Sequence, residues 1–193
     1  MPTLLPEKRD SPARRRVLAT ARALFYAEGI HAIGIDRIIA EAGVAKATFY
    51  HHFPAKDELV RAYVEEQSRL VQADIAQLRQ RSARERLLAI FDLIADTAER
   101  PDYRGCPFIN AAAEYPDPTS RVRQAIEEHR QWKRDLLRTL LVQDGNPDPE
   151  LTAEILMVLG DGLLITGHLD DPSKLRELIH DVVTAVIDAR RAA

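Results

Sequence analysis

Apolar residues recur three or four positions apart along almost the whole chain, which is the period of an amphipathic helix. No stretch shows the strict apolar and polar alternation, bounded by hairpin turns, that indicates β-strands. The first periodic segment spans residues 13–28, and Gly29 ends it; its apolar face consists of Val17, Leu18, Ala21, Leu24 and Phe25. The pattern therefore predicts an all-α protein.

Glycines and prolines divide the rest of the chain into further predicted helices. We expect these at 35–42, 45–52, 56–81, 83–99, 107–114, 119–143, 149–169 and 172–190. Three short helices fall within the first 55 residues, and the helix that follows is continuous across the join. We expect a first domain of short helices at 1–55 and a larger helical domain at 56–193.

The second and third short helices are joined by Gly43-Val44, which is the arrangement of a helix-turn-helix motif. In this motif the later helix enters the major groove of DNA. The third helix contains cationic, hydroxyl, imidazole and methyl groups that suit phosphates and base edges: Ala45, Lys46, Ala47, Thr48, Tyr50, His51 and His52. Phe49 and Phe53 are expected to point into the core. Taken singly, Tyr50 also fits a half-buried surface aromatic, and the histidines a solvated pair.

Charge is uneven along the chain, although the net charge is only -3. Residues 8–22 hold six basic residues (Lys8, Arg9, Arg14, Arg15, Arg16 and Arg22) and one acid, whereas residues 61–193 hold 18 basic and 23 acidic ones. The basic segment is able to face phosphates. It also fits the solvated start of a helix.

The segment AEAGVAKATFYHHFPAKDELV, residues 40–60, resembles the signature of TetR-type (tetracycline-repressor-like) bacterial regulators, and the resemblance covers residues 13–60 closely. It implies DNA contacts from Lys46, Thr48, Tyr50, His52 and Lys56, and it makes residues 1–55 the helix-turn-helix domain and residues 56–193 the ligand-sensing and dimerisation domain. We expect the basic first helix, which includes Arg16, to support these contacts. It places Ala47 and His51 where members vary, so these two residues are expected to set sequence preference.

Two positions depart from that family's pattern. Many members have a Thr-Thr pair before the second helix and a serine before the third, whereas this chain has Ile33-Gly34 and Ala45. Gly34 is still able to cap its helix. Ala45 supplies no side-chain oxygen, which costs about 1 kcal/mol of local helix stability relative to serine.

The last two predicted helices carry wide apolar faces that need a partner. The residues are Leu151, Ile155, Leu159, Leu163 and Thr166, then Leu175, Leu178, Ile179, Val182, Val183, Val186 and Ile187. They fit packing on the core of one subunit. The family resemblance implies instead a four-helix interface in a homodimer, where Gly160, Gly162 and Gly167 allow close approach. A twofold dimer suits a palindromic DNA operator.

Large apolar residues with a few polar groups between residues 60 and 170 are candidates for an effector pocket. They are Phe91, Ile94, Phe108, Asn110, Tyr115, Trp132 and Met157, each of which also fits plain core. The resemblance implies that a small-molecule effector favours a conformer with wrongly spaced recognition helices and so releases a repressor from DNA.

Cys106 is the single cysteine, which excludes an internal disulfide and suits a reducing compartment. If Arg104 and the adjacent helix start lowered its pKa, Cys106 would be a redox or electrophile sensor; otherwise it is a buried, inert residue. The N-terminus lacks a targeting pattern, and we expect no apolar run that approaches a membrane span. These features predict a cytoplasmic protein.

An enzyme is the first rival interpretation. The chain has two Glu-x-x-His strings, but Glu28 and His31 straddle Gly29, and the string at Glu177 lacks further ligands at matching spacing. Phosphate-binding and nucleophile motifs are also missing, so we expect neither enzymatic activity nor a metal or cofactor. The second rival is a helical ligand-binding adaptor that has lost DNA binding.

Overall fold

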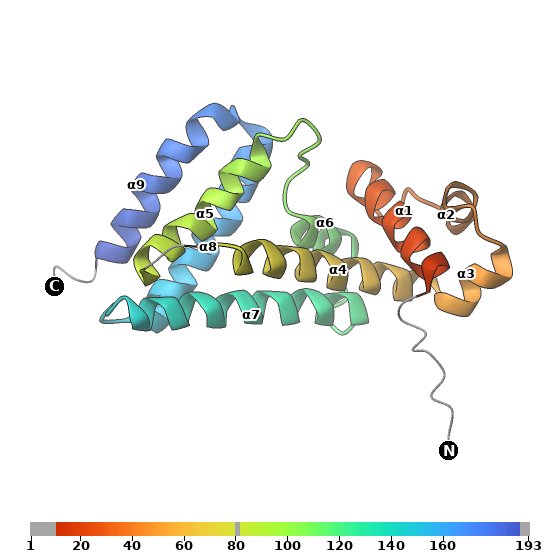
Figure 1. Ribbon diagram of the computed structural model, residues 1–193, viewed down its shortest axis with the longest axis horizontal. Helices are drawn as coiled ribbons and strands as arrows, with labels where there is room; N and C mark the ends of the chain where they lie inside the picture. The colour runs from red at the N-terminus through yellow and green to blue at the C-terminus, as the bar shows by residue number, and fades with distance from the viewer. Residues whose placement is uncertain (1–10, 80–81, 190–193) are drawn as a thin grey trace, which may run out of the picture. The chain divides into compact units, whose positions relative to one another are not determined.

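The computed structural model describes residues 11–79 and 82–189, which form helices and connecting turns with no strand among them (Figure 1). These residues fall into two compact units. The first is drawn from residues 1–67 and 110–126, and the second from residues 68–109 and 127–193. The all-α prediction is confirmed, whereas the proposed division at residue 55 stays a prediction.

The first unit is built around α1 (Pro12–Glu28), which contacts both α2 (Ile35–Ala42) and α3 (Lys46–His52). Ser11 caps α1 by accepting a hydrogen bond from the backbone N–H of Arg14 at 3.1 Å. The start of α4 (Lys56–Ala76) completes the apolar core of this unit. Its fully buried members include Val17, Ala21, Ile33, Ile38, Phe49, Leu59 and Val60.

The second unit has its core between α5 (Ala83–Ala98), α8 (Pro149–Leu169) and α9 (Leu175–Asp188), which pack against one another (Figure 1). A capping box of Ser82 and Glu85 starts α5. Residues 127–143 of α7 (Arg121–Gln143) add Leu137, Leu140 and Leu141 to the same core. The first residues of α6 (Pro107–Glu114) also belong to this unit, and its last residues to the first unit.

Helix boundaries differ from the predicted ones by a single residue in α1, α3 and α5, and by more than that in α4, α7 and the last predicted helix. Helix α4 ends at Ala76, before a turn, and α7 begins two residues later than expected because residues 117–120 form a turn. The last predicted helix is divided into a 3₁₀ turn, η2 (Pro172–Lys174), and α9. Asp171 accepts a hydrogen bond from the N–H of Ser173, which favours that tight turn.

Helix α8 carries apolar residues on two faces. Leu156, Met157 and Leu163 are buried in the core, whereas other apolar residues on the helix are exposed: Leu151, Ile155, Val158, Ile165 and Leu169. By length and composition alone α8 passes as a possible membrane span. The expectation that no apolar run approaches the length of a membrane span was therefore wrong. A core helix of a soluble protein passes the same test, and one face of α8 lies in the core.

The glycines of α8 do not share the role expected of them. A Cβ atom on Gly160 would lie 3.3 Å from Lys133 Nζ, and one on Gly167 would lie 2.8 Å from the Cβ of Ala98. These two glycines therefore allow close packing within the chain, and their assignment to an interface with a second copy was wrong. Only Gly162 of the three has open space in place of a Cβ.

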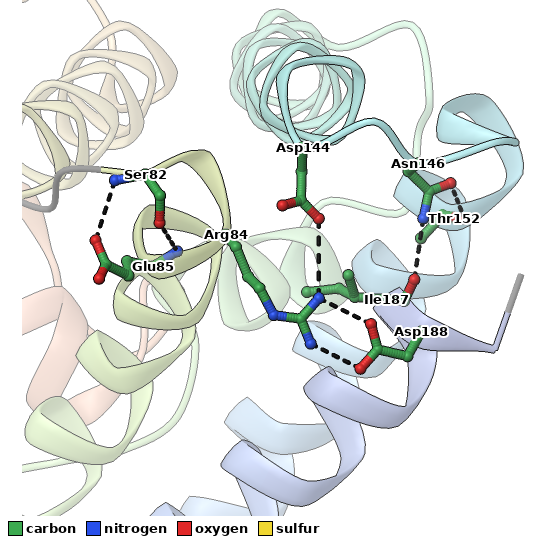
Figure 2. A network of polar contacts seen from close by, with 8 residues as sticks. All are labelled: Ser82, Arg84, Glu85, Asp144, Asn146, Thr152, Ile187 and Asp188. Atoms are coloured by element: carbon green, nitrogen blue, oxygen red, sulfur yellow. Dashed lines mark hydrogen bonds and ion pairs between the residues drawn. The ribbon is translucent and has the colours of Figure 1, made fainter. Parts of the chain in front are cut away.

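A polar network joins the turn between α7 and α8 to the end of α9 (Figure 2). The buried Asn146 amide donates to the carbonyl of Ile187 at 3.1 Å and accepts from the Thr152 hydroxyl at 3.1 Å and the N–H of Asp148 at 3.0 Å. Arg84 on α5 forms two hydrogen bonds with the carboxylate of Asp188, at 2.8 and 2.7 Å. The amide and the guanidinium therefore both hold the end of α9.

Replacing Asn146 by alanine tests the first of these contacts. Asn146→Ala leaves the buried Thr152 hydroxyl and Ile187 carbonyl without these partners, so we expect the free energy of unfolding to fall by about 2–4 kcal/mol. Urea denaturation at fixed protein concentration measures the loss. The matched control is the exposed neighbour Gln143→Ala, with an expected change within about 0.5 kcal/mol. Equal effects of the two changes would contradict the account.

A side-chain cap at the start of α3 is expected to stabilise the protein. Its N-cap, Ala45, has an extended backbone (φ -68°, ψ 146°) and forms no side-chain capping hydrogen bond. We expect Ala45→Ser to stabilise the protein by about 1 kcal/mol in urea denaturation. The same change inside α1, Ala23→Ser, is expected to cost up to about 0.5 kcal/mol. A loss of stability with Ala45→Ser would show that the missing side-chain cap does not limit the stability of α3.

Candidate nucleic-acid interface

The turn between α2 and α3 depends on Gly43. Its backbone is left-handed (φ 60°, ψ 44°), a conformation that favours glycine. The N–H of Gly43 donates to the carbonyl of Ala40 at 3.2 Å, and the N–H of Val44 donates to that of Ile39 at 3.3 Å. These bonds end α2 abruptly, so that only three residues separate the end of α2 from the start of α3. The helix-turn-helix predicted from the sequence is therefore present.

Two aromatic residues fix which side of α3 faces outward. Phe49 and Phe53 are 0% and 2% exposed, so the prediction that both point into the core is confirmed. Lys46 and Tyr50 lie beside this buried face and are exposed, Tyr50 by 40%, with its ring 5.3 Å from that of Phe49. Ala47 and His51 are exposed as well, and Thr48 is half-buried. The exposed face of α3 thus combines an ammonium, a phenol, an imidazole and a small side chain.

Lys46 is held by a neighbouring acid. Its Nζ lies 3.2 Å from the carboxylate of Asp36 at the start of α2, and both side chains are well exposed. The hydrogen bond that the Lys46 ammonium donates to Asp36 raises the pKa of Lys46, so this ammonium stays charged. An exposed pair of this kind is weak and is readily exchanged for a phosphate.

His52 and Lys56 are less available than Lys46. His52 Nε2 lies 2.9 Å from the hydroxyl of Ser11, which ties the end of α3 to the start of α1. Lys56 is half-buried, with its Nζ 6.0 Å from the centre of the Phe25 ring. Burial lowers the pKa of Lys56, although Glu114 and Asp57 act in the opposite direction. Any contact of these two side chains with DNA therefore competes with contacts inside the unit.

The basic start of α1 is divided between packing and solvent. Arg14 lies over the ring of Phe53, 5.1 Å from its centre, whereas Arg15 and Arg16 are exposed. Lys8 and Arg9, which were counted in the basic segment, lie outside the described residues. Arg16 is thus placed on the surface of the helix that supports α3.

Glu114, at the end of α6, holds the loop between α1 and α2. Its carboxylate accepts hydrogen bonds from the N–H of Ile30, at 2.7 Å, and of His31. Burial raises its pKa, but these N–H groups and the His31 imidazole outweigh that effect, so the pKa of Glu114 lies below its usual value. Beside it, Tyr115 stacks on His31 and donates to Asp57 at 2.9 Å. The loop is therefore fixed by residues more than 80 positions away in the sequence.

The candidate pocket residues do not all come together. Phe91, Ile94 and Met157 belong to the core of the second unit, with Trp132 packed against it, and Phe108 is buried in the same unit. Asn110 and Tyr115 belong to the first unit. Their roles toward an effector stay predictions.

Cys106 lies at the start of α6 and is buried. Burial raises the pKa of its thiol, which outweighs the backbone N–H groups of Ile109 and Phe108 that act in the opposite direction. The lowered pKa on which a sensing thiolate would depend is therefore not found. The geometry agrees with the alternative of a buried residue.

Two family models match this chain. Residues 17–63 match the bacterial regulatory proteins of the tetR family, and residues 83–182 match the tetracyclin repressor-like C-terminal domain. The first match covers the three helices around Gly43. The second lies within the larger helical part of the chain.

Individual proteins agree with these models. A TetR-family transcriptional regulator from Streptomyces coelicolor is 41% identical and superimposes with a TM-score of 0.87, covering 95% of this chain and 98% of its own. A transcriptional regulator from Saccharomonospora viridis, solved in complex with choline, is 22% identical (TM-score 0.77; 91% of this chain, 97% of its own), which shows the fold alone.

The HTH-type regulator YxaF of Bacillus subtilis is 44% identical over 48 residues, and these span 24% of this chain and 25% of YxaF. The match to the HTH-type regulator LmrA of the same organism, 34% identical, spans 33% of this chain and 35% of LmrA. The family consists of transcriptional regulators, which confirms the expectation that the chain is not an enzyme. This chain belongs to the TetR family of bacterial regulatory proteins and is a transcriptional regulator with a DNA-binding helix-turn-helix.

Proposed function

We propose that this chain is a cytoplasmic repressor that binds a palindromic DNA operator as a homodimer and is released by a small molecule. The observation that carries the proposal is the exposure pattern of α3: Phe49 and Phe53 are buried, whereas Lys46 and Tyr50 are exposed. An outward face of a cation and a phenol on the second helix of a helix-turn-helix suits the major groove.

The roles of the individual side chains follow from their chemistry and exposure. Lys46 exchanges Asp36 for a phosphate or a guanine edge, and Tyr50 donates its hydroxyl to a phosphate. Ala47 and His51 contact base edges and set sequence preference. Arg16, Thr48, His52 and Lys56 add backbone contacts, the last two after giving up part of their packing. Residues 1–55 then act as the DNA-binding domain and residues 56–193 as the sensing and dimerisation domain.

A homodimer is supported by the exposed apolar face of α8 and α9. Val158 is 72% exposed, Ile155 39%, Ile165 45% and, on α9, Leu178 44%. Exposed apolar patches of this kind mark interaction surfaces. A twofold dimer suits an operator whose two half-sites lie one turn of DNA, about 34 Å, apart.

Release by an effector requires that the effector bind one conformer better than the other. The buried Phe91 and Phe108 and the half-buried Trp132 of the second unit are the side chains that we propose to contact it. A TetR-like regulator of the same fold has been crystallised with choline, which shows that such a fold accommodates a small organic molecule.

Selection of bound fragments from a genomic DNA library tests the proposal. The variant Lys46→Ala then tests whether α3 makes the contact with DNA. On the best-enriched site we expect Lys46→Ala to weaken binding and to reduce the slope of log K against log salt by about 1, because one phosphate contact is lost. The matched control, Arg138→Ala on α7, removes an exposed cation outside α3 and leaves both quantities unchanged. If no site is enriched at low or moderate salt, the adaptor interpretation replaces this one.

Introducing one charged side chain into the exposed apolar face of α8 and α9 tests the proposed dimer interface. Val158→Asp puts a carboxylate in the centre of the proposed interface, where its desolvation opposes association. We expect sedimentation to show a monomer at concentrations where the unchanged chain is a dimer. The matched control is Val142→Asp, an exposed valine at the end of α7 (55% exposed), with no effect expected. A dimer that survives Val158→Asp and not Val142→Asp would move the interface to α7.

A further inference from the structure

An amine group lies inside the second unit, on α7. If Gly160 of α8 carried a Cβ, that atom would lie 3.3 Å from Lys133 Nζ and 3.4 Å from the ring of Phe91. Phe91 is fully buried, and Gly160 is buried as well. The missing side chain at 160 therefore lets the Lys133 ammonium and the Phe91 ring both lie close to the backbone of α8.

This ammonium has no acid paired with it. Among the described residues, none forms a hydrogen bond or an ion pair with Lys133 Nζ. Asp161, the next residue after Gly160, is engaged by Arg130, whose guanidinium lies 2.9 Å from the carboxylate. Burial lowers the pKa of Lys133, while Cys106 and Asp161 act in the opposite direction. A cation placed in such surroundings is costly unless an anion joins it.

The surroundings of Lys133 include aromatic rings as well as the Arg130–Asp161 ion pair. His129, one helical turn earlier, stacks on Phe108 with ring centres 3.7 Å apart and planes 6° apart. Burial, reinforced by Lys133 and Arg130, lowers the pKa of His129 to about 4, so this ring is neutral near pH 7. Trp132 lies 5.6 Å from His129. Lys133 is half-buried, so its side chain keeps some contact with solvent.

We propose that Lys133 is the anion-recognising group of the effector site and that the effector is a small organic carboxylate with an apolar body. The proposal rests on the ligand-responsive function proposed above. A carboxylate supplies one negative charge to the unpaired ammonium, and its apolar part suits the rings of Phe91, Phe108 and Trp132. A phosphate ester carries up to about two charges, whereas the neighbouring Arg130 is already paired with Asp161. A cationic molecule would be repelled by both Lys133 and Arg130.

Trp132 is the chain's only tryptophan, so its fluorescence reports on the residue beside Lys133. The probes are octanoate and 3-phenylpropanoate, each compared with its amide and with the primary amine of the same length. We expect at least one of the two acids to change the fluorescence saturably and to bind about tenfold more tightly than its amide. The amines are expected to show no saturable change.

The variant Lys133→Met keeps the length of the side chain and removes its charge, and we expect it to bind acid and amide equally. The matched control Arg134→Met removes the adjacent cation, which pairs with Glu154 at 2.7 Å, and is expected to keep the preference for acids. The comparison of acid with amide on the unchanged chain stands even if Lys133→Met fails to fold.

Equal affinity for acid and amide, a preference that survives Lys133→Met, or no saturable change with either acid would overturn the proposal. Because no DNA is present in this titration, its failure leaves operator binding untouched. Conversely, if no operator is found, the fluorescence titration still tests whether the protein prefers carboxylates.

Discussion

The packing of Phe49 and Phe53 is the interaction on which the DNA-facing surface depends. Helix α3 has seven residues and an N-cap without a side-chain hydrogen bond, so it lacks the length and the capping that stabilise an isolated helix. Its stability comes from burying these two rings, which are 0% and 2% exposed. The same burial fixes the rotation of the helix about its axis and places Lys46 and Tyr50 outside.

Other contacts in the first unit hold the helices that support α3. Gly43 sets the turn before it, Ser11 binds His52 at its end, and Arg37 joins α2 to the end of α1 by pairing with Glu28 at 2.7 Å. Glu114 then fixes the loop between α1 and α2. Since Glu114 ends α6, whose first residues belong to the second unit, one short helix contributes to both units.

Much of the fold could be predicted from the sequence because helical periodicity and glycine or proline boundaries are local signals. Gly43 and the buried pair Phe49 and Phe53 were predicted on that basis, and Ser11 before Pro12 carried a capping signal that was not used. The hydrogen bonds of Glu114 had no such signal, because their partners lie more than 80 residues away. The roles of Gly160 and Gly167 could not be predicted either, because a small residue on an apolar helix fits contact with the same chain or with a second copy.

The most direct test of the account is dimethyl sulfate footprinting on a selected operator fragment. Dimethyl sulfate modifies guanine N7 in the major groove and adenine N3 in the minor groove, so it reports which groove the protein occupies. The account predicts protection of guanine N7 in two half-sites one helical turn apart, and loss of that protection with Tyr50→Ala. Protection confined to adenine N3, or guanine protection unchanged by Tyr50→Ala, would contradict the assignment of α3 as the helix that reads DNA.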